Sequence, residues 1–213
     1  MATVHSVVWV KDDPFGLEYA EISLAPEQLS TAGVAIGSEP TPYRLDYELE
    51  TGREFITTRL RVTSRGSGWQ RGLDLRRDAA GTWTVDAEED GDADLPSAGG
   101  DPTMLADALD CDLALSPMTN LMPILRHGLL VSGDPVEVTA AWVSVPDLAV
   151  RADGQRYTFM SANESSRVVR FEATDGGFAA DIVVDLNGIV LDYPGIARRL
   201  GRRADGRRGT GLA

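Results

Sequence analysis

The sequence predicts a mainly β protein in which a curved antiparallel sheet forms an incomplete barrel, with one or two short helices as a plug or lid. Three observations predict this fold. Apolar and polar residues alternate with a period of two, turn signals separate the alternating runs, and helical periodicity is scarce. A large twisted sheet must close or curl to bury its apolar face. With few helices available, we expect it to curl around a plug.

The expected strands follow from the alternating runs. In residues 43–49, tyrosine and leucine alternate with charged side chains, which is typical of a half-buried strand. Residues 56–63 and 136–142 show the same alternation. Further strands are expected at 5–10, 17–24, 69–76, 82–85, 155–162, 167–173 and 178–185. Their succession through tight turns predicts an antiparallel meander.

Three sets of turn residues separate the later strands. Asn187-Gly188 lies between two apolar runs and predicts a type I′ hairpin, because both central residues of that turn take positive φ. Asp153-Gly154 and residues 175–177 mark two more turns. These signals favour hairpins over long crossovers.

Helix signals are few. Ser116-Pro117 predicts an N-cap followed by proline at the first helical position, opening a short helix that Pro123 ends or kinks. One more helical turn is expected at 103–109. The stretch 86–101 contains seven acids and no base, which predicts a solvated loop.

Length and composition predict one domain. We expect residues 1–199 to form the half-barrel and residues 200–213 to be a disordered, arginine-rich tail. Cys111 is the only cysteine, so no internal disulfide can form, and burial beside acids should raise its pKa. The N-terminus resembles no signal peptide, and no apolar run is long enough for a membrane span. These features predict a cytoplasmic protein without membrane insertion.

The net charge of −13 disfavours nucleic acid as a partner. Residues 198–213 hold six arginines and one acid, so the negative charge is concentrated in residues 1–197. Neither a metal site nor a cofactor motif is expected. Oligomeric state is left open by the sequence.

The segment 110–126, DCDLALSPMTNLMPILR, is the main candidate for a binding site, because it sets polar groups against an apolar run. Asp112, Thr119 and Asn120 could pair with sugar hydroxyls, and Arg126 could bind phosphate or carboxylate. The alternative is structural. Thr119 and Asn120 would then satisfy backbone groups in a turn, and Arg126 would pair with an acid of the domain.

Aromatic and basic residues on strands complete the candidate set. Tyr43, Tyr47 and Tyr157 could line a ligand cavity, although core packing is the more common role of such residues. Arg44 and Arg59 could select an anionic headgroup if their face were concave, and would otherwise face water. The expected ligand-binding residues are Tyr43, Arg44, Tyr47, Arg59, Asp112, Thr119, Asn120, Arg126, Tyr157, Asp192 and Tyr193.

Four blocks carry a family resemblance: PYRLDYEL at 42–49, the 110–126 segment, VPDLAVRADGQRYT at 145–158 and DLNGIVLDYPGI at 185–196. In this order they resemble the putative glycolipid-binding family of bacterial proteins. The resemblance extends to about Arg199. It implies a curved antiparallel sheet, similar to the lipoprotein-carrier half-barrels, with a hydrophobic cavity for a lipid or glycolipid. The apolar tail would lie inside, and the headgroup near 110–126.

Two other function classes stay open. A hydrolase or isomerase acting on a small carbonyl or sugar substrate would use Asp112, Asp192 or His127, but the chain has no nucleophile elbow, P-loop or dinucleotide motif, so catalysis is not favoured. An interaction module would instead dock a partner on an exposed sheet edge or on the basic tail.

Overall fold

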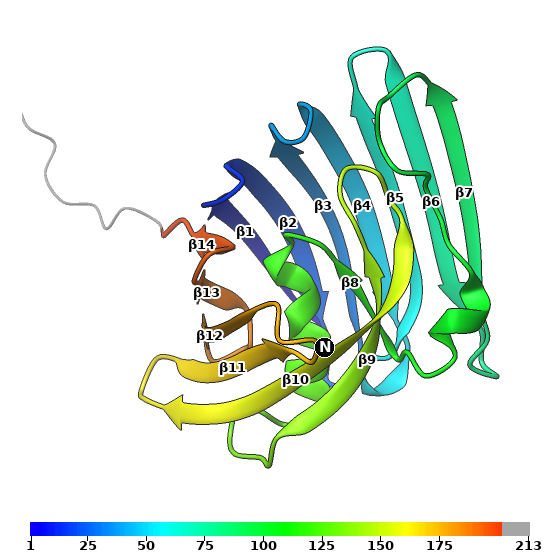
Figure 1. Ribbon diagram of the computed structural model, residues 1–213. Helices are drawn as coiled ribbons and strands as arrows, with labels where there is room; N and C mark the ends of the chain where they lie inside the picture. The colour runs from blue at the N-terminus through cyan, green and yellow to red at the C-terminus, as the bar shows by residue number, and fades with distance from the viewer. Residues whose placement is uncertain (202–213) are drawn as a thin grey trace, which may run out of the picture.

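A computed structural model describes residues 1–201 and shows one large curved sheet, open at both edges. The predicted mainly β fold with an incomplete barrel is therefore confirmed (Figure 1). The strands are β1 (Thr3–Lys11), β2 (Gly16–Leu24), β3 (Leu29–Gly37), β4 (Tyr43–Thr51), β5 (Thr57–Gly66), β6 (Trp69–Arg77), β7 (Trp83–Gly91), β8 (Asp110–Leu113), β9 (Val136–Val143), β10 (Val150–Ala162), β11 (Arg167–Ala173), β12 (Ala179–Val184), β13 (Val190–Tyr193) and β14 (Ala197–Arg199). The helical segments are η1 (Arg53–Phe55), η2 (Pro102–Leu105), η3 (Pro117–Asn120) and α1 (Leu121–Arg126).

The sheet consists of two meanders joined edge to edge. Strands β1 to β7 follow one another antiparallel, and β9 to β14 do the same. Strand β1 pairs with β14 and so joins the two halves. Strand β8 adds to the far edge, parallel to β9, and leads into η3 and α1. Figure 1 shows the sheet curving around this β8–α1 segment, which we call the plug (residues 110–126).

Strand β3 was not among the expected strands, because its residues are mostly small. Its glycines lie directly opposite the large aromatics of β4. Gly33 pairs with Tyr47 and Gly37 with Tyr43, and a Cβ at either glycine would stand within 2.5 Å of the tyrosine ring. The missing side chains therefore leave room for each ring to lie across the neighbouring strand.

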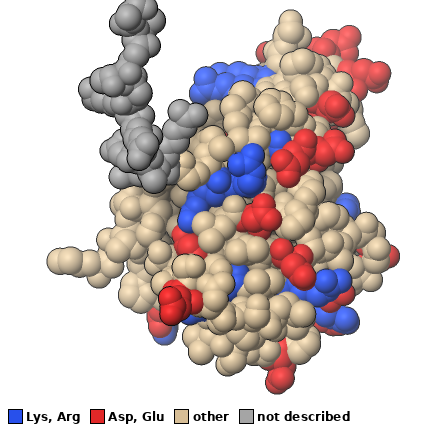
Figure 2. Space-filling view, turned by 90° about the vertical axis from the view of Figure 1, so that its left-hand side faces the viewer, with Lys and Arg blue, Asp and Glu red and all other residues tan. Residues whose placement is uncertain are grey.

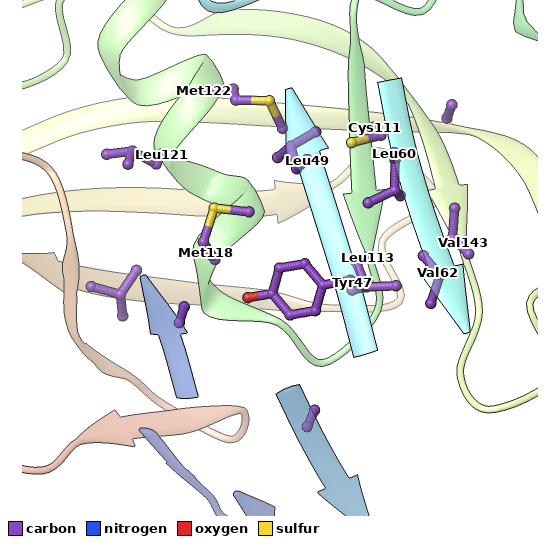
Figure 3. Close-up of a cluster of buried hydrophobic side chains, with 14 of the residues drawn as sticks. Tyr47, Leu49, Leu60, Val62, Cys111, Leu113, Met118, Leu121, Met122 and Val143 are labelled. Carbon is purple, nitrogen blue, oxygen red and sulfur yellow. The ribbon is translucent and has the colours of Figure 1, made fainter. Parts of the chain in front are cut away.

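The concave face of β1–β7 is filled by its own side chains and by the plug. Figure 3 shows leucine, valine and tyrosine side chains of β4 and β5 gathered with those of β8, η3 and α1. Met118 and Met122 of the plug are 2% and 0% exposed. The expected short helix is thus confirmed as a plug, and this half of the hollow is a hydrophobic core.

The structure corrects three local predictions. Pro123 neither ends nor kinks the helix, because α1 begins at Leu121 and proline in a first turn loses no helical hydrogen bond. The hairpin at 187–188 forms, but only Gly188 takes positive φ, so the turn is not type I′. Asp153-Gly154 is no turn, since both residues lie inside β10.

The acidic stretch is also more ordered than expected. Strand β7 runs to Gly91 at the sheet edge, with an outer half that is exposed and acidic. Trp83 at the start of β7 packs in the core, and the exposed charges of the outer half oppose edge-to-edge association. The buried guanidinium of Arg71 then donates to the carbonyl oxygens of Leu95 and Asp147, at 3.3 and 3.0 Å, tying the following loop to the β9–β10 turn.

The expected tail falls largely outside the described residues, which end at 201. Within residues 1–201, none of the helices has the length and apolar character needed to cross a bilayer. Basic, acidic and uncharged side chains are interspersed over the face that Figure 2 presents.

Candidate functional site

A cavity of about 300 Å³ lies between the plug and the concave face of β9–β13. Leu113, Phe171 and Tyr193 of the hydrophobic core are part of its lining. The lining comprises Asp112, Leu113, Ala114, Leu115, Ser116, Asn120, Trp142, Arg151, Asp153, Gln155, Phe171, Ala173, Asp175, Gly177, Phe178, Tyr193 and Ile196. The register of the sheet assembles much of this lining. Asp112 lies opposite Trp142, and Trp142 lies opposite Arg151, so three strands contribute one row of side chains.

One wall of the cavity is polar and centres on Asp112. Its Oδ1 accepts a 2.7 Å hydrogen bond from Thr119 Oγ1, and its Oδ2 accepts a 2.7 Å bond from Gln155 Nε2. The same Nε2 lies 3.4 Å from Oδ2 of Asp153. Burial raises the pKa of the Asp112 carboxyl above its ordinary value, and the two hydrogen bonds oppose that shift. Asp112 is therefore held in a fixed orientation at the cavity.

Behind this wall, Tyr157 connects the plug to β10. Its hydroxyl lies 3.0 Å from Oδ1 of Asn120 and 3.1 Å from Oε1 of Gln155, and shares its one hydrogen between them. Burial raises the pKa of Tyr157 well above its usual value, so the hydroxyl stays protonated. The Asn120, Tyr157, Gln155 and Asp112 side chains thus form one hydrogen-bonded network.

Another part of the cavity lining is aromatic. Phe171 and Phe178 have ring centroids 6.0 Å apart, and Tyr193 lies 6.1 and 6.0 Å from them. Such tilted and edge-to-face arrangements are favourable and leave ring surface for a ligand. Burial raises the pKa of Tyr193, which keeps its hydroxyl neutral. At the mouth, the guanidinium of Arg151 lies 4.4 Å from the Trp142 ring centroid.

Three of the expected ligand-binding residues line this cavity: Asp112, Asn120 and Tyr193. Thr119 and Tyr157 lie one layer behind, where they hold Asp112 and Asn120 in place. The structural alternative for Thr119 and Asn120 is supported as well. The Thr119 hydroxyl lies 3.2 Å from the carbonyl oxygen of Ser116, and Nδ2 of Asn120 lies 3.4 Å from that of Pro117.

Tyr43 and Tyr47 lie in the hydrophobic core instead of the cavity, 5% and 3% exposed. Tyr47 donates a 2.8 Å hydrogen bond to Oε1 of Glu18, and Ser116 of the plug donates a 2.5 Å bond to the same oxygen. Lys11 Nζ lies 3.1 Å from the other oxygen of Glu18. This buried cluster connects the plug to β1, β2 and β4.

The three expected arginines all pair with acids outside the cavity. Arg44 contacts Asp46 at 2.6 Å and Arg59 contacts Asp74 at 2.6 Å, both on the outer face of the sheet. Their strands must present alternate residues to opposite faces, and the tyrosines and leucines take the inner one. Arg126 forms a bidentate, buried pair with Asp110, as its structural alternative predicted. Arg44, Arg59 and Arg126 are thus outside the cavity lining, and ligand contact by them stays a prediction.

The three proposed catalytic residues are not brought together. Asp112 lines the cavity, whereas Asp192 of β13 and His127 after α1 are not part of its lining. Burial and the neighbouring Arg126 lower the pKa of His127. Burial raises the pKa of Cys111, as expected from its sequence environment. Across residues 1–201, no cluster of histidine, cysteine and acid side chains could hold a metal ion.

Several cavity residues were missed because Asp153-Gly154 was interpreted as a turn. As part of β10, residues 151, 153, 155 and 157 alternate onto the concave face and bring Arg151, Asp153 and Gln155 to the cavity. The register with β9 then fixes the contact between Arg151 and Trp142. Phe178 was expected to begin the strand at 178–185, but it precedes β12 in a glycine-containing turn.

Comparisons with known proteins agree with this architecture. The model of a family described as "Putative glycolipid-binding" matches residues 6–199. A crystal structure of a DUF1089 family protein from Pseudomonas aeruginosa is similar, with a TM-score of 0.65 and 28% sequence identity over 86% of this chain and 92% of that one. Among curated proteins, none matches this sequence.

Proposed function

The chain belongs to the family described as "Putative glycolipid-binding", and from the geometry of its cavity we propose that it binds the sugar headgroup of a glycolipid. One observation carries the proposal: the cavity lining combines the aromatic side chains of Phe171, Phe178 and Tyr193 with polar side chains that include Asp112 and Asn120. A sugar ring needs this combination, because its apolar face stacks on aromatic rings while its hydroxyls pair with carboxylates and amides.

The size of the cavity supports a headgroup as the bound part. At about 300 Å³, it lies at the small end of ligand sites and suits one sugar ring better than a complete amphiphile. An apolar tail was expected inside the hollow, but the concave face of β1–β7 is filled by side chains and covered by the plug. We therefore propose that the tail leaves through the mouth of the cavity.

Fixed orientation of the polar groups also supports binding. Asp112 is held by Thr119 and Gln155, and Asn120 is held by Tyr157, before any ligand arrives. Preorganised groups lose little conformational freedom on binding, so more of the interaction energy contributes to affinity.

Isothermal titration calorimetry with short-chain alkyl glycosides, kept below their micelle concentration, tests the proposal. Binding of the glycosides is expected, together with no binding of alkanols of the same chain length. Binding of both classes alike would favour a general lipid site, and binding of neither would overturn the proposal.

A pair of Phe→Ala variants locates the site. Phe178 lines the cavity and packs on Phe171 and Tyr193, whereas Phe15 is 65% exposed between β1 and β2 and is not part of the lining. Phe178→Ala should weaken glycoside binding about tenfold through lost stacking and burial. Phe15→Ala should leave it unchanged. Thermal melting of both variants separates lost contact from lost folding.

A further inference from the structure

We propose that the cavity selects a sugar headgroup bearing a protonated amine over its uncharged counterpart, and that it rejects an anionic headgroup. This inference rests on the proposed function and deepens it. Two observations support it: the charged side chains that line the cavity, and the ion pair that the one lining arginine, Arg151, already forms.

Three carboxylates and one guanidinium line the cavity. Asp112, Asp153 and Asp175 provide the negative charges, and Arg151 provides the positive one. A hydroxyl of a sugar can pair with a carboxylate or with a guanidinium, so its binding does not depend on the net charge of the lining. The affinity for a charged substituent does depend on that net charge, because the low-dielectric walls of a cavity strengthen electrostatic attraction and repulsion alike.

Arg151 is paired with one of the three lining carboxylates. Its guanidinium lies 2.9 Å from Oδ1 of Asp153 and 4.4 Å from the centroid of the Trp142 ring. The negative charge of Asp153 balances the positive charge of Arg151, and the cation–π contact holds the guanidinium against Trp142. Asp112 and Asp175 then remain without a guanidinium among their hydrogen-bond partners, so the cavity has a net negative charge.

The two remaining carboxylates lie at different depths. Asp112, a residue of the plug, is half-buried, while Asp175 lies exposed in the β11–β12 turn. An amine could therefore meet a carboxylate deep in the cavity or near its mouth. An ammonium beside Asp112 would also offset the burial that raises the pKa of that carboxyl.

The arginines that could have favoured an anion are placed elsewhere. Arg59 and Arg76 both contact Asp74 on the outer face, at 2.6 and 3.1 Å, and Arg61 contacts Glu48 there at 2.6 Å. Period-two alternation puts them on the side of the sheet opposite the cavity. The sequence suggested selection of anions by strand arginines, and the structure locates the carboxylates in the cavity instead.

Calorimetry with three matched methyl glycosides tests the inference: a hexosamine with a free amine, the same sugar N-acetylated, and the corresponding uronic acid. The hexosamine should bind about tenfold more tightly than the N-acetylated sugar, since a charge-assisted hydrogen bond replaces a neutral one. The uronic acid should bind most weakly. Raising the salt concentration should reduce the preference, because Asp175 is exposed to screening.

Asp175→Asn removes one charge and keeps the turn, because an asparagine Oδ1 can still accept the 2.8 Å hydrogen bond from the Gly177 amide. It should reduce the amine preference about threefold, as expected for an exposed ion pair. Glu164→Gln, in the exposed turn between β10 and β11, removes the same charge away from the cavity and should leave the preference unchanged.

The outcomes separate this inference from the proposed function. Tight binding of the hexosamine with a preference that depends on Asp175 supports both. Binding of the N-acetylated sugar with no gain from the amine, or equal binding of the uronic acid, overturns the charge selection and leaves headgroup binding intact. Failure of every glycoside to bind overturns both.

Discussion

Oδ2 of Asp112 on β8 accepts a 2.7 Å hydrogen bond from Nε2 of Gln155 on β10. These residues are 43 positions apart, and their contact fixes the plug against the strand that forms the cavity wall. The cavity is therefore shaped by long-range polar contacts between the plug and the second meander, while both meanders contribute to the hydrophobic core.

The pH dependence of stability should change in Asp112→Asn. The folded-state pKa of Asp112 is raised above 3.8, so the folded state holds its proton more tightly than the unfolded state. Stability of the unaltered protein should therefore decrease as pH rises from about 4 through the raised pKa. The Asn variant should lack this decrease. Urea unfolding from pH 4 to 7 measures both profiles, and parallel profiles would contradict the role assigned to Asp112.

Tyr157→Phe should destabilise the domain without changing its packing. The ring keeps its edge-to-face contact with Phe171, whose centroid is 5.3 Å away, but the hydroxyl between Asn120 and Gln155 is lost. Leaving buried amide groups unsatisfied costs about 1–3 kcal/mol. Chemical unfolding measures this loss, and an unchanged unfolding midpoint would show that the network contributes nothing to stability.

Arg126→Met should lower stability strongly and leave glycoside affinity unchanged. Arg126 and Asp110 form a bidentate pair whose side chains are 7% and 4% exposed, outside the cavity lining. Removing one partner of a buried pair costs about 3–5 kcal/mol. The double variant Arg126→Met/Asp110→Asn should recover part of that loss. A weakened glycoside affinity in a folded Arg126→Met protein would instead show that Arg126 contributes to ligand binding.

Lys11→Met should be more harmful than the double variant Lys11→Met/Glu18→Gln. The side chains of Lys11 and Glu18 are 4% and 0% exposed and lie 3.1 Å apart. The single variant leaves a buried carboxylate without its cation, at a cost of about 3–5 kcal/mol. In the double variant, the glutamine that replaces Glu18 keeps an acceptor for Tyr47 and Ser116 without the charge. Equal unfolding midpoints for the two variants would contradict this coupling.

The fold was largely predictable because period-two alternation directly reflects burial. Residues 43–49 form β4 with the expected inner and outer faces, and the Ser116-Pro117 signal located the plug. Strand β3 was not predictable in the same way. Its small residues are explained by the tyrosines opposite Gly33 and Gly37, and such pairing depends on the register between strands.

The candidate site was less predictable for the same physical reason. Asp112 and Asn120 were found because they belong to one segment that sets polar groups against an apolar run, but the contact of Gln155 with Asp112 joins residues 43 positions apart in the chain. The position of an arginine in the alternating pattern of a strand shows which residues share its face. Only the fold shows whether that face is concave. Arg44 and Arg59 proved to lie on the outer one.

Nuclear magnetic resonance mapping of glycoside binding tests the central claim most directly. On addition of an alkyl glycoside, backbone amide chemical shifts should change in β8, in β10 and at the β11–β12 turn, near Asp112, Gln155 and Phe178. The outer face of β4 and β5 should be unaffected. Shift changes confined to that outer face, or no changes at saturating glycoside, would contradict the assignment of the cavity as a headgroup site.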